Sequence, residues 1–527
     1  MEYDKYTFES SSSTTKSRHP YRLYTMFNDN GFTQSELHPK YGKYNQRRTL
    51  CIYAVLTGFF VVCTSVMLFV FGGMDEKLLS VSDMKLPHHV SRRSAPNNSY
   101  YSPHNEPAGD FLKEDRVAEH CHLPDIPALG MEGFYEKEKY TLEQVHVILS
   151  SGETTPHQLH PDLPVADCRY NSYTTGTLQD FPNIVNSYIR ANKAQTKFNK
   201  YTISNEQKCP PGQLSPLGMT KIHQHGRYIR DIYSESLKSR LDIHHSSKWL
   251  KVVSGEDPSS FHSTLSYLSG FLPQKHLHRV HIEKVTNHLC DWSKSDCHCP
   301  RMDRSASFSM DNVATLIQNQ KLGNKDKSFK RFIKSFLGRN LSAVQAFSQL
   351  SPLICDKVLA PIGCHGNHCW NVSRLHVVKL FQAIDKHLED WMTNRPNIEQ
   401  SRLHMYPFLT SLLKSFKQAH IRTSPRLFIY TSNEEFMLQL LTAIENKLGK
   451  FPRPGSRLVF ELLSTTKQEK KQYFLRVLFN GRDVTNDIPL CSRRNADRIC
   501  PLKYFVDFHS LNFRNMFSLS SYTERCL

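Results

Sequence analysis

An uncharged run of 26 residues, Thr49 to Met74, is the feature that most restricts how this chain can fold. A bilayer core requires about 20 consecutive apolar residues, so the run is long enough to cross a membrane as one helix. It begins too far from the N-terminus for a standard cleaved signal peptide, and we therefore expect a retained signal anchor. The sequence predicts a chain whose parts lie on two sides of a membrane.

The basic residues around this run predict its orientation. Four precede it and two follow it: Lys40, Lys43, Arg47 and Arg48, then Lys77 and Lys85. Because positive charge is enriched on the cytosolic side, residues 1–48 are expected in the cytosol and the chain from Asp75 onward in the lumen, a type II topology. Residues 1–48 are rich in Ser, Tyr, Asn and Thr without an apolar period, which is typical of a disordered tail.

Two further features favour a body inside the secretory pathway. Acceptor patterns for N-glycosylation occur only after the apolar run, at Asn97, Asn340 and Asn371. Two of the fourteen cysteines, Cys51 and Cys63, lie in the run, and the other twelve follow it. An even number in an oxidising compartment favours disulfides over metal ligands, and the sequence leaves the pairing open. Local bridges within 290–299 and within 355–369 are two possibilities.

Composition limits the function classes. The formal net charge of +18 comes from 67 Lys and Arg against 49 Asp and Glu, and it is spread along the chain. Without a basic block, nucleic acid is not an expected partner; a solvated basic surface is the simple interpretation, and affinity for an acidic polymer or an anionic membrane is the alternative. No zinc-type spacing of His and Cys occurs, so we expect neither a metal site nor a cofactor. Residues 75–139 are polar and predict a luminal stem, and residues 140–527 predict one luminal domain.

The central motif of that domain is VHVILSSGETTP, Val145 to Pro156. Its apolar half predicts a buried strand, and the Ser-Ser-Gly-Glu-Thr-Thr-Pro half predicts a loop at the carboxyl end of that strand, where open α/β sheets bind ligands. The stretch resembles the signature of the histidine acid phosphatases, a strand followed by Arg-His-Gly-x-Arg-x-Pro. Gly152 and Pro156 match this signature. Ser150, Ser151 and Thr154 stand where the family has arginine, the nucleophilic histidine and a second arginine.

Other segments resemble the same family in the same order. Leu214 to Tyr233 and Leu265 to Pro273 are similar to the family's next two helices, and Ser259 falls where the family has a further arginine. Leu427 to Leu441 is similar to the strand and helix that carry its late His-Asp pair, with Asn433 for the histidine and Glu434 for the aspartate. Phe451 to Leu463 and Phe474 to Val484 are similar to its closing hairpin, and Asn480-Gly481 predicts a hairpin turn. Within the family, the cysteine clusters are most similar to those of the 2-phosphoxylose phosphatases.

The resemblance implies an α/β fold: a mixed sheet with flanking helices and a smaller helical cap, with helical candidates at Lys327 to Leu337 and Leu375 to Met392. The positions that match the family's catalytic residues are Ser150, Ser151, Thr154, Ser259, Asn433 and Glu434. We expect none of them to be catalytic, so the resemblance implies that this chain lacks the family's mechanism. The simplest role for Asn433 is the N-cap of the following helix. Glu434 is then a solvated or capping carboxylate at the start of that helix.

Three functions remain open at this point. The first is a non-catalytic pseudophosphatase of the Golgi membrane that binds an acidic glycan or a glycosaminoglycan-synthesis enzyme. The second is an active acid phosphatase acting on 2-phosphoxylose in the glycosaminoglycan linker or on another phosphomonoester, with Ser151 as a possible altered nucleophile. The third is that the luminal domain has only a structural role, and that the cytosolic tail and the membrane anchor carry the function. The pattern Ser254-Gly255-Glu256-Asp257 is that of a glycosaminoglycan attachment site, although an ordinary polar loop is the simpler expectation.

Overall fold

The computed structural model describes the chain in separate stretches, all of them within one compact unit, Pro103–Leu527. These are residues 115–121, 130–156, 167–169, 178–192, 198–206, 208–237, 249–285, 343–356, 362–365, 368–421, 423–447, 449–492 and 499–517. The expected tail, the apolar run 49–74, the helical candidate 327–337, Asn97 and Asn340 lie outside them. Within these stretches, no helix combines the length and the apolar character needed to cross a membrane.

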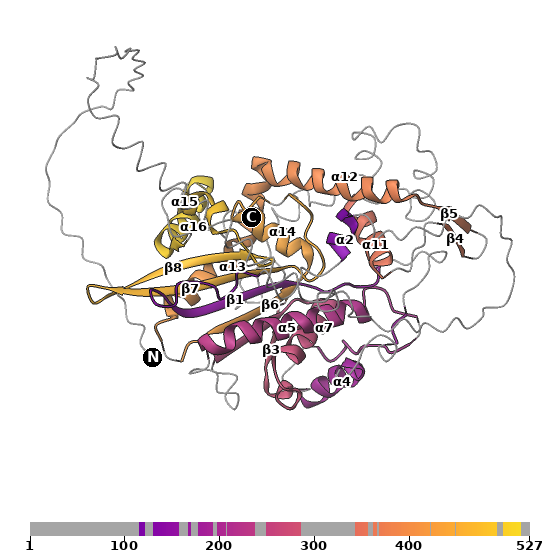
Figure 1. Ribbon diagram of the computed structural model, residues 1–527, viewed down its shortest axis with the longest axis horizontal. Coiled ribbons are helices and arrows are strands. Elements are labelled where there is room, and N and C mark those ends of the chain that lie inside the picture. Colours follow the sequence, from indigo (N-terminus) through magenta and orange to yellow (C-terminus); the bar gives the residue numbers. More distant parts are fainter. Residues whose placement is uncertain are drawn as a thin grey trace, which may run out of the picture. The chain divides into compact units, whose positions relative to one another are not determined.

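A mixed sheet forms the centre of the unit (Figure 1). Its strand order is β10-β8-β7-β1-β6-β2-β3, with β9 paired to β8. β1, β6, β2 and β3 are parallel neighbours, whereas β7 is antiparallel to β1 and β8 is antiparallel to β7. The strands span Thr141–Ser150 (β1), Leu250–Ser254 (β2), Ile282–Lys284 (β3), Leu427–Ser432 (β6), Arg457–Lys467 (β7), Lys470–Phe479 (β8), Arg482–Asp483 (β9) and Cys500–Pro501 (β10). A separate hairpin joins β4 (Ile362–His365) and β5 (His368–Asn371).

Helices cover both faces of this sheet. They span Asp115–Cys121 (α2), Phe181–Ala191 (α4), Pro216–Leu237 (α5), Pro258–Phe271 (α7), Ala343–Cys355 (α11), Arg374–Thr393 (α12), Arg395–Gln418 (α13), Glu434–Ala443 (α14), Pro489–Ser492 (α15) and Leu502–Phe517 (α16), with 3₁₀ turns at Gln274–Arg279 (η4) and Thr485–Asp487 (η7). The predicted mixed sheet with flanking helices is therefore confirmed, and α12 contains the helix expected at Leu375 to Met392.

Alternation along β1 divides the hydrophobic core into two parts. Successive side chains of a strand point to opposite faces. Val147 accordingly packs in the core that includes residues of α5 and α7, and Ile148 packs in the core that includes residues of α13, α14 and α16. Both side chains are fully buried. A strand covered on both faces is expected to be apolar along nearly its whole length, which explains the run that the sequence shows here.

Two glycines bring α5 and α7 into close contact. A Cβ on Gly226 would lie 2.0 Å from the carbonyl oxygen of Tyr267, and one on Gly270 would lie 2.0 Å from the carbonyl oxygen of His223. Any side chain at either position would force the helices apart. The close packing fixes the start of α7 relative to the sheet, and with it the predicted site residue Ser259.

The turns of the β7–β8–β9 region agree only in part with expectation. Asn480 and Gly481 both have positive φ, 49° and 87°, and close the predicted turn between β8 and β9. The turn between β7 and β8 uses Gln468 and Glu469, with φ of 50° and 62°. Neither residue type favours the left-handed region, so this turn carries no strong signal in the sequence.

Three disulfides connect described cysteines: Cys121–Cys355, Cys168–Cys209 and Cys491–Cys500. The expectation of a local bridge that uses Cys355 is wrong, because its partner Cys121 lies 234 residues away. The two sulfurs meet because α2 packs against α11. Cys364 and Cys369 are backbone partners in the β4–β5 hairpin. The cysteines at 290–299 lie outside the described residues.

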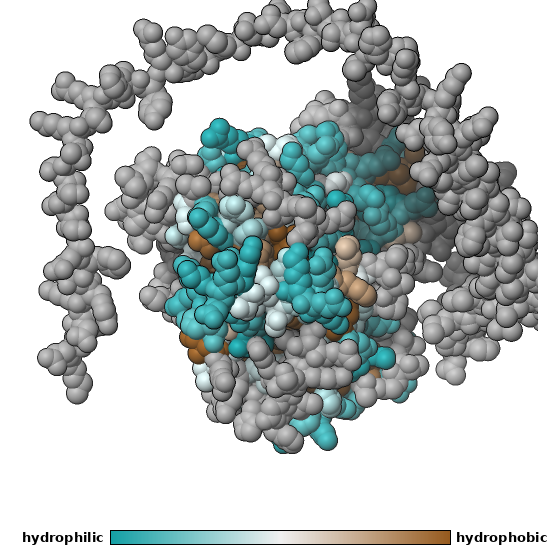
Figure 2. Space-filling model, turned by 60° about the vertical axis from the view of Figure 1, so that its left-hand side comes forward, coloured by the Kyte–Doolittle hydropathy of each residue, from teal (hydrophilic) through white to brown (hydrophobic). Residues whose placement is uncertain are grey.

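Part of the expected stem packs against the domain. Val117 of α2 is fully buried, and Met131 donates its backbone N–H to the carbonyl of Gly481 at 2.8 Å. The boundary at residue 139 itself stays a prediction. On the face drawn in Figure 2, hydrophilic side chains cover most of the described surface and hydrophobic ones form small separate patches. Among the residues that the structure describes, Phe134 is the most exposed of the large apolar side chains, at 71%.

A buried charge network ties β7, β8 and α5 together. Arg476 donates to the carboxylate of Glu461 at 2.8 Å and to that of Asp483 at 2.9 Å. Tyr233 donates its hydroxyl to the other oxygen of Glu461 at 2.5 Å. The side chains of Arg476 and Glu461 are 3% and 0% exposed. Because such a pair is shielded from water, removing one partner leaves the other charge without compensation.

We therefore expect Arg476→Ala to lower the free energy of unfolding by about 3–5 kcal/mol. Urea denaturation followed by circular dichroism measures this change. Arg482→Ala is the matched control, since Arg482 pairs with Asp487 at the surface and its side chain is 77% exposed; its effect should stay within about 1 kcal/mol. Equal effects of the two substitutions would show that the buried network is not a main source of stability.

Candidate functional site

The site is built where three parallel strands end. Ser150 at the end of β1 is the register partner of Ser432 at the end of β6, and Ser254 at the end of β2 is the partner of Thr431. The carboxyl ends of parallel strands meet at one edge of the sheet, which is the usual position of a ligand site in this architecture. The loop after β1, the start of α7 and the start of α14 all lie at this edge. The sequence segments predicted to form the site are thus brought together.

Ser151 is held by the neighbouring strand and by α7. Its backbone N–H and its hydroxyl donate to the carbonyl of Ser432, at 2.7 Å and 3.1 Å. Its Oγ also lies 3.1 Å from Oγ of Ser260 and 3.5 Å from Oγ of Ser259. The residue is 3% exposed. Ser151 and Ser259, two of the predicted positions, are therefore neighbours in a buried hydroxyl cluster.

Asp257 organises that cluster from the start of α7. As the N-cap residue it accepts a hydrogen bond from the backbone N–H of Ser260 at 2.8 Å, and Pro258 follows at the first helical position. The hydroxyl of Ser260 donates to the same carboxylate at 2.6 Å, and that of Ser259 also donates to it. The donors of the cluster thus lead toward Asp257. The arrangement anchors α7 to the ends of β1 and β6.

Ser150 and Thr154 have different surroundings. Ser150 is fully buried, and its hydroxyl donates to the carbonyl of Arg453 at 3.3 Å. Thr154 lies farther along the loop, where its backbone pairs with Leu214 in an isolated bridge, and its side chain is half-buried. Ser150 therefore faces the chain segment that leads into β7.

A buried ion pair joins the loop after β1 to α5. Lys221 of α5 contacts the carboxylate of Glu153 at 3.2 Å, with side-chain exposures of 9% and 0%. Burial raises the pKa of Glu153, and the ammonium of Lys221 opposes this rise. The start of α5 also touches the loop backbone: a Cβ on Gly218 would lie 2.2 Å from the carbonyl oxygen of Glu153. The loop and α5 therefore fit together through a glycine and a buried ion pair.

Asn433 and Glu434 begin α14. The side-chain oxygen of Asn433 accepts the backbone N–H of Phe436 at 2.9 Å, which confirms the predicted N-cap. Glu434 is half-buried in the first turn of α14, where a solvated or capping carboxylate was expected. Burial raises its pKa to about 7, and the charges of Asp257 and Glu153 act in the same direction.

A fourth carboxyl group, Asp356, comes from the residue after α11. Burial raises the pKa of Asp356 to about 8; the charge of Glu153 adds to the rise, whereas Lys221 and a hydrogen bond with Ser215 oppose it. The site edge therefore combines neutral hydroxyls with the carboxyl groups of Asp257, Glu153, Glu434 and Asp356. Sequence reasoning missed Lys221 and Asp356 because each reaches the loop from a distant part of the chain. Asp257 had a local signal, an N-cap residue followed by proline.

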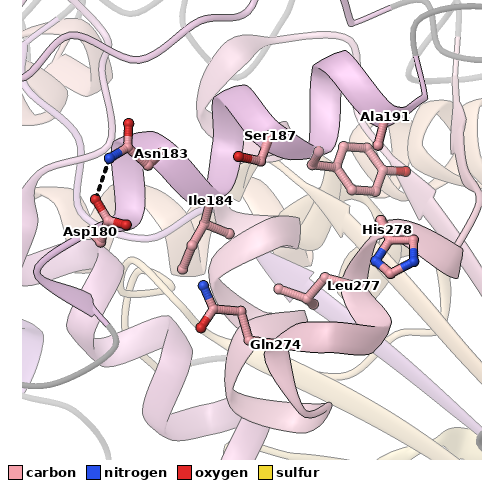
Figure 3. A pocket seen from close by; sticks show the side chains of 9 residues that line it. Asp180, Asn183, Ile184, Ser187, Ala191, Gln274, Leu277 and His278 are labelled. Atoms are coloured by element: carbon pink, nitrogen blue, oxygen red, sulfur yellow. Dashed lines mark hydrogen bonds between the residues drawn. The ribbon is translucent and has the colours of Figure 1, made fainter.

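The described residues contain no group of three or more His, Cys, Asp or Glu side chains placed to hold a metal ion. The expectation that the protein needs no metal or cofactor stays untested. A groove of about 330 Å³ lies elsewhere, between α4 and η4 (Figure 3). Its lining residues are Asp180, Asn183, Ile184, Ser187, Tyr188, Ala191, Gln274, Leu277 and His278. The six predicted positions are not among them, so the groove is separate from the site at the strand ends.

Comparison with solved structures finds phytases and an inositol polyphosphate phosphatase at low similarity. The phytase from D. castellii shares 13% identity over 78% of this chain and 87% of that chain, with a TM-score of 0.44. The apo form of the multiple inositol polyphosphate phosphatase of Bifidobacterium longum shares 9% identity over 75% and 96%, with a TM-score of 0.42. These TM-scores are too low to assign a family, and the assignment rests on the sequence comparisons that follow.

Curated relatives cover most of the chain. The 2-phosphoxylose phosphatase 1 of Mus musculus is 24% identical over 423 residues, 77% of this chain and 85% of the relative. The protein of the same name from Homo sapiens is 23% identical over 400 residues, 74% and 81%. The model of the histidine phosphatase superfamily (branch 2) matches residues 141–480, from the first residue of β1 to the turn after β8. This match spans well over half of the sequence, and the chain belongs to the histidine phosphatase superfamily, branch 2.

Proposed function

We propose that this chain is a pseudophosphatase, a member of the superfamily that does not hydrolyse phosphate esters. The observation that carries the proposal is the buried ion pair between Glu153 of the signature loop, residues 150–156, and Lys221 of α5. In the family pattern this loop holds the cations that receive phosphate. Here Lys221, a cation that contacts the loop, is already paired with a carboxylate of the same loop. Ser150 and Ser151 beside it are 0% and 3% exposed.

The chemistry of the replaced positions supports this proposal. The family's mechanism requires a histidine that attacks phosphorus, arginines that stabilise the transferred group and an acid that protonates the leaving oxygen. Ser151 stands for the nucleophile, and Ser150, Thr154 and Ser259 stand for arginines. Nucleophile loss in a protease lowers turnover by roughly 10⁶, because catalytic groups act as a unit. A serine without a cationic partner supplies none of these roles.

The charge at the site also opposes phosphate. A phosphate monoester is negatively charged. Its repulsion by other negative charges becomes stronger when it leaves water, because Coulomb energies are larger in a medium of low dielectric constant. Asp257, Glu153, Glu434 and Asp356 lie in or near the loop. Burial is the largest cause of the raised pKa values of the last three, so this edge of the sheet disfavours the charged carboxylate form, and an anionic ligand would lose solvation there in the same way.

The cellular setting is part of the proposal. We infer a single-span, type II protein of the Golgi membrane, with residues 140–527 in the lumen, from the apolar run 49–74 and the flanking charges. The disulfides between described cysteines support an oxidising compartment. The relatives named 2-phosphoxylose phosphatase 1 suggest a role beside proteoglycan synthesis. Their name also favours the second candidate function, an active phosphatase on 2-phosphoxylose.

The proposed partner is an acidic glycan or an enzyme that builds one. The formal charge of +18 supports attraction to a sulfated polymer.

The Ser-Gly pattern at Ser254 is not exposed for glycosaminoglycan attachment. Ser254 is fully buried at the end of β2, and its hydroxyl donates to the carbonyl of Gly255, so the simpler expectation of an ordinary structural segment fits this part of the chain.

We expect no phosphate release from p-nitrophenyl phosphate or 2-phosphoxylose by the purified protein, and Ser151→Ala should leave the background unchanged. The mouse 2-phosphoxylose phosphatase 1 is the positive control in the same assay. A variant with Ser150→Arg, Ser151→His, Thr154→Arg, Ser259→Arg, Asn433→His and Glu434→Asp tests restoration. An enzyme-like rate in the native protein that disappears in Ser151→Ala would establish the phosphatase function instead.

The raised pKa of Glu434 gives a pH dependence. The folded protein binds this proton more tightly than the unfolded chain does, so the stabilising contribution is complete below a pH of about 4.5 and is lost as the pH rises through about 7. Glu434→Gln should therefore raise the free energy of unfolding at pH 8 by about 1–2 kcal/mol relative to the native protein, after allowance for partial exposure. A higher melting temperature at pH 8 measures this change. The difference should vanish at pH 4.5. Glu435→Gln, at an exposed neighbouring position, is the control and should show no such change.

Binding of the protein to a sulfated glycan should depend on salt. We expect retention on immobilised heparin that weakens as sodium chloride shortens the range of the attraction to about 3 Å at 1 M. A neutral dextran column is the control. Elution from both columns in the same low-salt fraction would exclude an acidic glycan as the partner and leave the enzyme partner as the proposal.

A further inference from the structure

A short helix from the N-terminal side of the domain lies against the helical layer beside the site. Figure 1 shows α2, Asp115–Cys121, next to α11 and α12, and residue contacts join it to both helices. Val117 and His120 are 0% and 3% exposed. The helix has only seven residues, too few to be stable alone in water, so its order depends on these contacts.

Covalent, ionic and aromatic contacts fix α2 to this helical layer. Cys121 is bonded to Cys355 at the end of α11. The guanidinium of Arg116 donates twice to the carboxylate of Asp385 on α12, at 2.5 Å and 2.6 Å, in the bidentate geometry that makes such pairs strong. The ring of His120 packs edge-on against Phe347 of α11, with 5.0 Å between ring centres.

The other side of α2 reaches the signature loop through two basic side chains. The ammonium of Lys221 donates to the carbonyl of Cys121 and to the carboxylate of Glu153, so it joins the last residue of α2 to the loop. The guanidinium of Arg453 donates to the carbonyl of Glu119 at 3.0 Å. The carbonyl of Arg453 accepts the hydroxyl of Ser150, which completes a second connection.

A third connection comes from α11. Asp356 directly follows the disulfide cysteine Cys355, and its side chain forms a hydrogen bond with Ser215. The backbone N–H of Ser215 donates to the carbonyl of Glu153 at 2.9 Å. The disulfide therefore joins two segments that each contact the same loop, one through Lys221 and one through Ser215.

From this arrangement we propose that α2 is a strap that closes the loop 150–156, with the Cys121–Cys355 disulfide and the Arg116–Asp385 pair as its fastenings. Release of the strap is the step that exposes the loop to solvent and to any ligand. The proposal concerns access alone and holds whether the loop is catalytic or not. The helix α2 belongs to the stretch 75–139 that the sequence predicts as the stem, so the strap is a part of that stretch that packs against the domain.

The test introduces a reporter thiol in the loop, Ser151→Cys, in the full-length protein. Reaction with a maleimide is followed by mass spectrometry of the peptide that contains position 151. The strap variant adds Cys121→Ser, Cys355→Ser and Arg116→Ala. The matched control adds Cys491→Ser and Cys500→Ser, which remove a disulfide between α15 and β10. A second reporter, Ser150→Cys, checks that the result does not depend on the hydroxyl cluster around Ser151.

In the intact protein we expect labelling that is slow and limited by opening of the strap. The strap variant should label at least about tenfold faster, because reaction of a transiently opened site follows the population of the open form. The control should label at the intact rate. Fast labelling in all proteins would show that the loop is never closed, and slow labelling in the strap variant would show that α2 does not control access; either result overturns the proposal.

Hydrogen exchange of β1 and β7 separates strap release from unfolding. Protection of these strands should be the same in the strap variant and in the intact protein. If the strap variant loses it, Arg116→Ala alone decides, because this variant keeps the disulfide. A faster reaction at position 151 with protected strands then supports the strap, and an unchanged rate contradicts it.

Discussion

The parallel pairing of β1 with β6 and of β6 with β2 is the constraint on which the other features of this domain depend. It places Ser150, Ser432 and Ser254 at one edge of the sheet, and the loop after β1, α14 and α7 start from that edge. β1 is buried on both faces, so a change of register by one residue would reverse every side chain between two cores. Backbone pairing therefore sets the positions of these three serines, whereas side-chain hydrogen bonds of Ser151, Ser259 and Asn433 hold the starts of α7 and α14.

The positions where the family resemblance predicts charged groups lie in a network of hydroxyls, one carboxylate and one ion pair. The hydroxyls of Ser151, Ser259 and Ser260 lead to Asp257, and the carboxylate of Glu153 is met by Lys221. Protein interiors are closely packed and their buried polar groups are hydrogen-bonded. Where small residues stand at positions that hold arginine or histidine in the family, neighbouring side chains must fill the volume and supply the hydrogen bonds. The hydroxyl donors named here have acceptors within the chain, whereas Oε1 of Glu153 is buried without a hydrogen-bond partner. An open phosphate site would keep its donors free for a ligand.

Local features of the fold could be predicted from the sequence, and long-range ones could not. The apolar run at Val145 to Leu149 gives a buried strand, Asn480-Gly481 gives a turn, and Asn433 gives an N-cap, because each depends on neighbours within a few residues. The pairing of Cys121 with Cys355 and the approach of Lys221 to Glu153 depend on how α2 and α5 pack, which no local pattern contains. The positions of Ser151 and Ser259 were found by family resemblance. Their mutual contact then required the three-dimensional structure.

The central strand has a consequence for how the protein is made. β1 is among the first strands to leave the ribosome, yet the residue that accepts the backbone N–H of Ser151 is Ser432, 281 residues later. At about 5–20 residues per second, that partner is synthesised roughly a quarter of a minute to a minute afterwards. During this interval an apolar strand without its neighbours is exposed to aggregation, and a chaperone in the compartment of synthesis is the natural protection. The apolar side chains that bury β1 on both faces in the finished domain are the ones that make it prone to aggregation during synthesis.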